Sequence, residues 1–424
     1  MKTIPLSDVT LFVRNGASIK QSKITHDGYP ITRIETLSNG IFNYDKMGFA
    51  SIKDDKYKDF YLKNNDVLLS HINSEKFLGR SVLYINHGEG PIIHGMNLLN
   101  IRFDQQKYTP SFFVWYTKSA KAKNFFRENT KHAVNQASIA SSAIKSMPVP
   151  DVPLDYQETI SNSLNQIEKT IHSKQNLLCS LDSLVKSLFN EMFGDPEANS
   201  KNFEVGKIND IGKCVAGATP STSVKEYWEN GTIPWLSSGE VNKGHIYETD
   251  SFITQLGYDN ASTKLVPAHT VVLAMAGQGK TRGTPAIAEI ELCTNQSICS
   301  IVNNEKVNAE YLYHYLLTQY GNLRSSSNGD GGRGGLNLKI IGNFRIIIPP
   351  IELQNEFADF VKLIDKSKFV CHSRYFLWLC LTLESSTMAY SSVVSIFECP
   401  KRRWTCSIGI PLSIAFVANV RRNL

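Results

Sequence analysis

An internal repeat constrains this chain more than any other feature, because a repeat decides the architecture before single elements are considered. Four segments recur in the same order at a spacing of about 200 residues, which suits two copies of a domain and is too long for a solenoid. Each copy opens with an apolar segment that leads into a glycine, Gly16 in the first copy and Gly217 in the second. A segment containing isoleucine and proline follows, at residues 29–34 and 232–236.

The third pair of segments matches more sharply. Residues 66–70 (DVLLS) and 270–274 (TVVLA) have the continuous apolar pattern of buried strands. Each strand enters a loop that closes on a glycine, Gly79 or Gly283, and another apolar stretch follows. Both copies are therefore expected to contain a buried strand, a loop and a second strand.

Proline clusters close both copies, at residues 147–153 and 346–350. Gln157 and Gln354 stand at equal distances beyond the last prolines. A helix is expected after each cluster, because proline is tolerated at the first helical position and the acidic residues that follow favour the first turn.

The first of these helices carries a heptad seam. Its apolar positions alternate four and three residues apart for more than four heptads, with only Lys174 out of pattern, and Gly194 supplies the stop. The seam consists of Ile160, Leu164, Ile167, Ile171, Leu178, Leu181, Val185 and Leu188. The helix could simply pack on its own domain, but a length of roughly 55–60 Å favours a spacer between two modules.

The helix after the second copy begins in the same way, at Phe357, Val361 and Ile364, and loses its pattern near residue 369. The charged outer face disappears there, and the apolar pieces that follow are too interrupted for a membrane span of about 20 residues. We therefore expect a distal helix shortened to residues 351–369. The atypical tail, 370–424, is the kind of sequence that a change of reading frame produces.

These segments predict an α/β (α+β) chain in five parts. The parts are 1–150, the first module; 151–195, the central helix; 196–350, the second module; 351–369, the distal helix; and 370–424, the tail.

Composition sets broad limits on the class of protein. With 424 residues, 42% hydrophobic and 20% charged, the chain is long enough for two or three soluble globular domains. A net charge of +6 is compatible with a polyanionic partner without requiring one. The eight cysteines include no CxxC pair, and Pro5 and Asp8 interrupt any secretory signal, so reduced thiols and a cytoplasmic location are expected.

A duplicated module of this size, with a proline-led helix after each copy, resembles the specificity subunit of Type I restriction–modification systems. The resemblance covers roughly residues 1–369 and rests on the order and repetition of its motifs. The motifs are Pro148-Val149-Pro150 with Tyr156-Gln157-Glu158-Thr159-Ile160, Ile348-Pro349-Pro350-Ile351-Glu352-Leu353-Gln354, Gly277-Gln278-Gly279-Lys280-Thr281-Arg282-Gly283 and Leu336-Asn337-Leu338.

The resemblance implies two tandem target-recognition domains, each reading one half of a bipartite double-stranded DNA site. It also implies long antiparallel, coiled-coil-like helices that relate the domains as a pseudo-two-fold repeat and dock two methyltransferase subunits. Restriction/translocase subunits would join through these, and S-adenosylmethionine, ATP and Mg would bind to the partners and not to this chain. The alternative is a protein-interaction scaffold without DNA specificity.

The loop from Ala276 to Arg282 is the strongest candidate for DNA contact. Gln and Arg can read adenine and guanine in the major groove, while Lys and Thr suit phosphates. The candidates are Gln278, Lys280, Thr281 and Arg282. A nucleotide phosphate loop is the competing interpretation, but Ala274 stands where its first glycine belongs and no helix opens after Thr281.

Other segments carry weaker candidates. The loop of the first module offers His71, Asn73, Lys76 and Arg80; the strand near 235 offers Trp235 and Ser237; and the glycine-rich segment 328–335 offers Arg333. Each has a plain alternative: a surface loop, a core tryptophan and a mere connector, respectively. A basic run on an expected helix from Pro110 to Arg127 is interpreted first as a solvent-exposed helix face and second as a contact with the DNA backbone.

Catalytic constellations are missing from the sequence. It contains no Asp/Asn-Pro-Pro-aromatic methyltransferase motif, no HExxH and no Gly-x-Ser-x-Gly, and its ten histidines show no metal-ligand spacing. We therefore expect a non-catalytic chain without a metal site.

Overall fold

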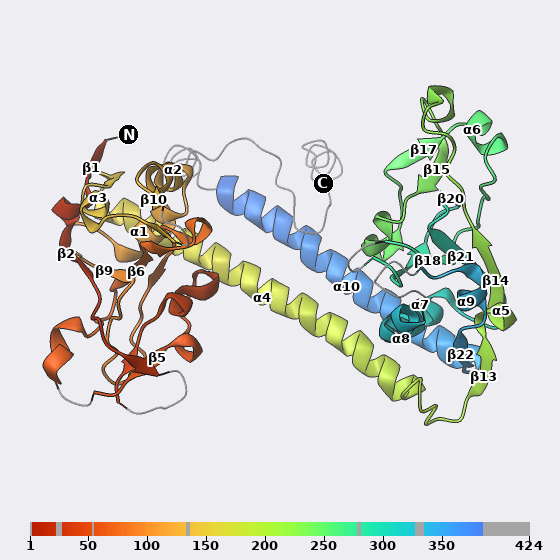
Figure 1. The fold of residues 1–424 in the computed structure, drawn as a ribbon, viewed down its shortest axis with the longest axis horizontal. Coiled ribbons are helices and arrows are strands. Elements are labelled where there is room, and N and C mark those ends of the chain that lie inside the picture. The colour runs from red at the N-terminus through yellow and green to blue at the C-terminus, as the bar shows by residue number, and fades with distance from the viewer. Residues whose placement is uncertain are drawn as a thin grey trace. The chain divides into compact units, whose positions relative to one another are not determined.

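The structure is a computed structural model and describes residues 2–22, 28–52, 55–132, 136–277, 281–326 and 335–384 (Figure 1). The chain divides into two compact units, Met1–Ser173 with Tyr375–Leu424, and Lys174–Arg374. The division falls within helix α4 (Leu154–Phe193), so each unit receives one half of this helix. Among the described residues, every helix falls short of the length or the apolar character that crossing a bilayer requires.

A four-stranded antiparallel sheet forms the centre of the first unit, in the order β2-β9-β6-β8. Its strands are β2 (Thr10–Asn15), β9 (Leu98–Phe103), β6 (Val67–Ser70) and β8 (Ser81–Leu83). Val67 and Leu69 pack against one core cluster and Leu68 against another, so both faces of the sheet are buried. Burial on both faces explains why this strand reads as a continuous apolar run.

Helices cover one face of this sheet, and short strands complete the unit. The helices are α1 (Pro110–Thr117), α2 (Ala120–Glu128) and α3 (Ser141–Lys145). The strand pairings are β1 (Thr3–Pro5) with β12 (Pro148–Pro150), β3 (Gln21–Ser22) and β4 (Pro30–Ile31) with β5 (Gly48–Ala50), and β7 (Ile72–Asn73) and β10 (Lys131–His132) with β11 (Ala137–Ser138).

The single helix expected from Pro110 to Arg127 is wrong, because the structure contains two helices there. The break lies at Ser119, whose hydroxyl accepts a hydrogen bond from the backbone N–H of Ala122 at 3.2 Å and caps α2. Serine at this position competes with the helical backbone and starts a new helix.

The second unit repeats the same central sheet with one more strand, in the order β14-β21-β18-β19-β16. The strands are β14 (Gly212–Ala216), β21 (Ile298–Asn303), β18 (Thr270–Ala274), β19 (Pro285–Ala288) and β16 (His245–Ile246). The added strand β16 pairs parallel to β19, whereas all other pairs in this sheet are antiparallel.

Helices and short strands complete the second unit. The helices are α5 (Ile208–Ile211), α6 (Gln255–Asp259), α7 (Ala309–Thr318), α8 (Tyr320–Ser325), α9 (Leu338–Gly342) and α10 (Ile351–Glu384), of which α10 belongs to this unit as far as Arg374. The strand pairings are β13 (Glu204–Lys207) with β22 (Arg345–Ile348), and β17 (Ser251–Ile253) and β20 (Cys293–Thr294) with β15 (Ile233–Leu236).

The glycines that open the two copies occupy positions of close backbone approach. A Cβ at Gly16 would lie 2.0 Å from the carbonyl oxygen of Gly95, and a Cβ at Gly217 would lie 1.8 Å from that of Thr294. Only glycine can occupy such positions without displacing the backbone. The repeat seen in the sequence is thus a repeat of packing geometry.

The matched glutamines also perform the same task. Gln157 and Gln354 are buried, and their side-chain oxygens accept hydrogen bonds from the N–H groups of Thr109 and Asn308, the residues before α1 and α7, at 2.8 and 2.9 Å. Their amide groups donate to backbone carbonyls five residues earlier, at 2.8 Å in both units. Each glutamine therefore ties the start of one helix to the start of another and satisfies buried backbone groups.

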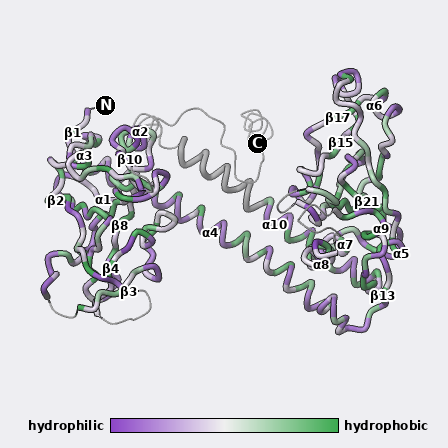
Figure 2. The backbone as a smooth tube through the Cα atoms, viewed as in Figure 1, coloured by the Kyte–Doolittle hydropathy of each residue, from purple (hydrophilic) through white to green (hydrophobic). Residues whose placement is uncertain are grey.

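Helix α4 begins after Pro153 and ends before Gly194, which has a positive φ of 71°. The helix and its termination are confirmed. Figure 2 shows hydrophilic and hydrophobic residues alternating along it. Ile160 and Leu164 pack in the core of the first unit, whereas Leu181, Val185 and Leu188 pack in the core of the second. The other seam positions are less covered: Ile167 and Leu178 are half-buried, and Ile171 is 37% exposed.

Within the second unit, the end of α4 packs antiparallel to α10. Phe193 lies near Phe357, with ring centroids 5.5 Å apart, and Asp182 forms a 2.9 Å ion pair with Lys368. Phe357, Val361 and Ile364 all belong to the same core cluster. The apolar residues expected at the start of the distal helix are therefore its packed face.

The shortened distal helix, 351–369, is wrong, since α10 continues to Glu384. Loss of the heptad pattern removes a signal for packing partners, but it does not remove helix propensity. Residues 370–384 contain neither proline nor glycine, so nothing in the backbone ends the helix at 369. The rest of the tail lies outside the described residues.

A buried histidine makes the stability of the first unit depend on pH. His94 is fully buried, and burial lowers its pKa from 6.5 to about 4. Below pH 6.5 the unfolded chain binds a proton that the folded chain excludes, so stability should fall between pH 6.5 and 4, by about 3 kcal/mol in total. His71, with a pKa also lowered to about 4, acts in the same direction.

Chemical denaturation at a series of pH values measures this slope. His94→Gln should reduce the slope without abolishing it, because His71 remains. His132→Gln, at a side chain 67% exposed, is the matched control and should leave the slope unchanged. Equal slopes for the His94 variant and the parent would contradict the assignment.

Candidate nucleic-acid interface

The two candidate loops leave their sheets through the same hydrogen-bonded closure. In the first unit, the N–H of Ser70 donates to the carbonyl of Arg80 at 2.8 Å, and the N–H of Gly79 donates back to Ser70 at 2.9 Å. In the second unit, Ala274 donates to Thr284 at 3.0 Å and Gly283 donates back to Ala274 at 2.8 Å. We call this pair of bonds the loop clamp.

Both clamp glycines have left-handed backbone angles, with φ of +75° at Gly79 and +83° at Gly283. Side chains rarely adopt this region, and a Cβ at Gly79 would also lie 2.0 Å from the ring of Phe126. The expectation that both loops close on a glycine therefore has a physical basis in each unit.

The loop of the first unit is more ordered than a plain connection. Asn73 lies in β7, which pairs with β11, and its amide donates to the hydroxyl of Ser70 at 3.1 Å. Lys76 is exposed, with its ammonium 4.8 Å from the ring centre of Phe77, and Arg80 lies over the same ring at 4.6 Å. The two cations therefore share one aromatic platform.

His71 is placed differently from the other loop candidates. Its side chain is only 5% exposed, and burial holds it in the neutral form. Its backbone carbonyl accepts a hydrogen bond from the N–H of Ile139 at 2.8 Å. His71 thus anchors the base of the loop from the interior.

The basic run near α2 is tied in part to the protein itself. Lys118 forms a 2.9 Å ion pair with Glu168 of α4 and lies 3.8 Å from the ring centre of Trp115. The tryptophan donates to Asn165 of the same helix at 2.8 Å. These contacts fasten α1 to α4, a role that the sequence did not indicate.

In the loop of the second unit, Thr281 and Arg282 are described and half-buried, whereas Gln278, Lys280 and Arg333 lie outside the described residues. The carbonyl of Arg282 accepts a hydrogen bond from the guanidinium of Arg324 at 3.3 Å, and the same guanidinium contacts the Tyr320 hydroxyl at 3.0 Å. Helix α8 therefore supports the end of this loop. The chain after Thr281 forms a turn and then β19 rather than a helix, as expected.

Trp235 and Ser237 both make internal contacts. Trp235 is 8% exposed, donates to the carbonyl of Ala218 at 3.0 Å and packs edge-on against Trp228. The hydroxyl of Ser237 donates to the buried carboxylate of Glu240 at 2.9 Å. Trp235 is therefore a core residue, which was the alternative to a DNA contact.

Residues 1–181 and 200–373 match the family model described as the Type I restriction modification DNA specificity domain. The chain belongs to this family.

Named relatives agree with the assignment. The type I restriction enzyme MjaX specificity subunit of Methanocaldococcus jannaschii is 29% identical over 378 residues, or 85% of each chain. The EcoR124I/EcoR124II specificity subunit of Escherichia coli is 28% identical over 161 residues, which cover 38% of this chain and 39% of that relative. The S subunit structure from M. genitalium matches with a TM-score of 0.60 at 14% identity, covering 95% of this chain and 96% of that one, and supports the fold.

This specificity subunit has two tandem target-recognition domains and is not a catalytic subunit. The two family matches correspond to the two units that the sequence repeat indicated. The alternative of a scaffold without DNA specificity receives no support from these relatives.

Sequence reasoning missed two residues that support the candidate DNA-contact segments of the specificity subunit. Arg324 stands 42 residues from the carbonyl that it contacts, and Glu240 orients Ser237 from a short 3-10 helix (Glu240–Lys243). Neither residue lies in a motif, so no signal in a single sequence distinguishes them from ordinary surface charges.

Proposed function

We propose that each target-recognition domain contacts one half of a bipartite double-stranded DNA site, with the clamped loops supplying direct contacts. The observation that carries the proposal is the loop clamp, which presents different side chains from the same position of the same sheet in both domains. Two domains with one frame and different loops suit the reading of two different half-sequences.

The partners follow from the same proposal. The helices α4 and α10 dock two methyltransferase subunits, and restriction/translocase subunits join through these. S-adenosylmethionine, ATP and Mg bind to the partner subunits, and the complex acts in the cytoplasm. This arrangement is supported by the names of the relatives, which are specificity subunits of type I restriction enzymes.

Domain-specific substitutions in the assembled complex test the proposal. Arg282→Lys keeps the positive charge but removes the planar group that reads guanine, so discrimination should relax in one half-site by about 1–3 kcal/mol. Lys76→Gln, in the loop of the other domain, should alter only the other half-site or the salt dependence of binding.

The measurement combines DNA binding at several salt concentrations with genome-wide mapping of methylated adenines, after co-expression with the methyltransferase subunit. The unaltered complex should bind a defined bipartite site and lose affinity steeply as salt rises. A complex without preference among duplexes, or equal loss at both half-sites in either variant, would refute the proposal.

A further inference from the structure

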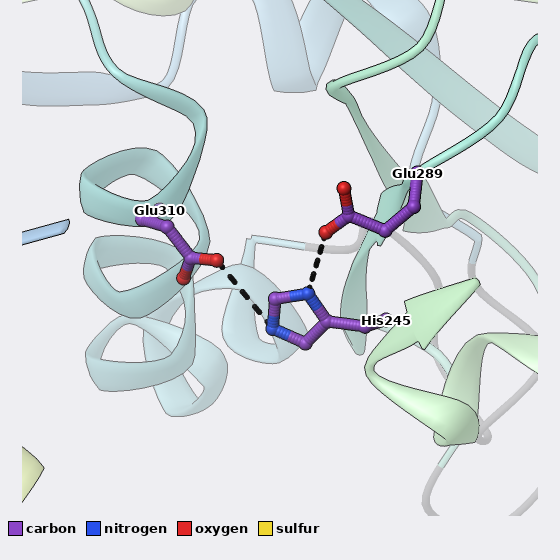
Figure 3. A group of neighbouring side chains, drawn as sticks. All are labelled: His245, Glu289 and Glu310. Carbon is purple, nitrogen blue, oxygen red and sulfur yellow. Dashed lines mark hydrogen bonds and ion pairs between the residues drawn. The ribbon is translucent and has the colours of Figure 1, made fainter. Parts of the chain in front are cut away.

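Three side chains from three different elements of the second unit converge beside the added strand β16 (Figure 3). His245 lies in β16, Glu289 directly follows β19, and Glu310 lies in the first turn of α7. The imidazole lies between the two carboxylates, with Nδ1 2.7 Å from Glu289 Oε1 and Nε2 3.6 Å from Glu310 Oε1. All three side chains are largely buried, with 13–21% of each exposed.

The protein satisfies the two carboxylates unequally, since Glu289 contacts the imidazoles of both His245 and His269, at 2.7 and 3.1 Å. Glu310 Oε2 is shielded from solvent and accepts no hydrogen bond. Nε2 of His314 lies 3.8 Å from this oxygen, which is beyond hydrogen-bond distance. A buried carboxylate with an unsatisfied oxygen is costly unless a cation lies beside it.

We propose that His245, Glu289 and Glu310 bind one divalent transition-metal ion, for which zinc is the best match. One donor atom from each residue lies within 4.8 Å of the other two. Zinc holds its nitrogen and oxygen ligands at about 2.0–2.2 Å, so small side-chain rotations bring the three donors onto one ion. Magnesium and calcium prefer all-oxygen sites, whereas the imidazole favours zinc.

Coordination replaces the hydrogen bond between His245 and Glu289. The imidazole binds a metal in its neutral form through one nitrogen, so binding releases any second proton to solvent. Three protein ligands leave a fourth position for water. The ion would then cross-link β16, β19 and α7 at the edge of the sheet.

The first domain provides an internal comparison. The residues before α1 and α7, Thr109 and Asn308, are matched through their glutamines, so the second helical residues, Ser111 and Glu310, correspond. Serine replaces the carboxylate there, and among the residues described for that domain no strand extends its four-stranded sheet in the way β16 does. The proposed metal site is therefore a property of the second domain and does not depend on the proposed contacts with DNA.

Zinc titration of the full chain, freed of metal by dialysis against a chelator and carrying no histidine tag, tests the proposal. Competition with a chromophoric chelator should reveal one tight Zn²⁺ per chain. Glu310→Gln should weaken that affinity by about 100-fold or more, because loss of an outer-shell partner of a ligand already costs about 10–100-fold. Glu291→Gln is the matched control, because it makes the same change at an exposed residue near Glu289 and should leave the affinity unchanged.

X-ray absorption at the zinc edge gives a second readout that needs no variant. The zinc-loaded parent chain should show a first shell of nitrogen and oxygen only. Absence of tight zinc binding by the folded chain, equal affinity in Glu310→Gln, or a sulfur atom in the first shell would overturn the proposal. Far-UV circular dichroism of each variant verifies that loss of zinc reflects loss of the ligand and not unfolding.

Discussion

Replacing Phe193 by alanine is expected to lower the free energy of unfolding of the second unit by about 3–5 kcal/mol. Phe193 is fully buried in the last turn of α4, and its ring lies 4.9 Å from that of Phe189, 4.7 Å from that of Tyr311 and 5.5 Å from that of Phe357. Truncation leaves a cavity where α4, α7 and α10 meet, and the surrounding rings cannot close it without losing their own contacts.

Hydrogen exchange read by mass spectrometry localises this loss to one unit, and chemical denaturation gives its size. Leu184→Ala is the matched control on the same helix, because Leu184 is 47% exposed, and it should cost about 0.5 kcal/mol or less. Similar destabilisation by both substitutions would show that the aromatic cluster does not hold α4 to the second unit.

Replacing Arg102 by methionine should destabilise the first unit by about 3–5 kcal/mol, since it leaves a buried carboxylate without its cation. The carboxylate of Asp66 is 1% exposed and accepts two hydrogen bonds from the Arg102 guanidinium, each 2.7 Å long. Asn100 donates to the same carboxylate at 3.0 Å. In the variant the carboxylate keeps two neutral donors, the Asn100 amide and the backbone N–H of Lys63. These do not replace the two charged hydrogen bonds of the arginine.

The second unit supplies the control for this prediction. Val67 pairs with Ile101 and Val271 with Ile301, which aligns the two sheets. The hydrogen-bonded set of the first unit, Asp66, Asn100 and Arg102, then corresponds to Thr270, Ser300 and Val302. The triple variant D66T/N100S/R102V should recover most of the lost stability, as measured by denaturation. A triple variant as unstable as Arg102→Met would show that the cost is steric and not electrostatic.

The frame of both domains could be predicted from the sequence because its signals are local and repeated. Each signal marks one local backbone feature: an apolar run such as 66–70 marks a buried strand, a proline marks a helix start, and a glycine marks the loop clamp. The distal helix was predicted too short because heptad spacing reports packing and not the end of a helix.

The candidate site could be predicted only in outline. The loops were located correctly between their strands, but no local pattern shows that His71 is buried or that its backbone carbonyl bonds to the distant Ile139. The cluster at His245 was missed entirely, because its ligands are separated by up to 65 positions and its strand is two residues long. Such convergence arises from topology and leaves no spacing signal in a single chain.

The loop clamp also bears on how such a protein can change over generations. Its two backbone hydrogen bonds, with a glycine at one end, hold the strand ends together whatever residues lie between them. Mutations within the loop can therefore accumulate without disturbing the register of β6 with β8 or of β18 with β19. Under the proposed function, a new DNA-sequence preference then requires substitutions at only a few loop positions, and the strand pairing of each sheet stays the same.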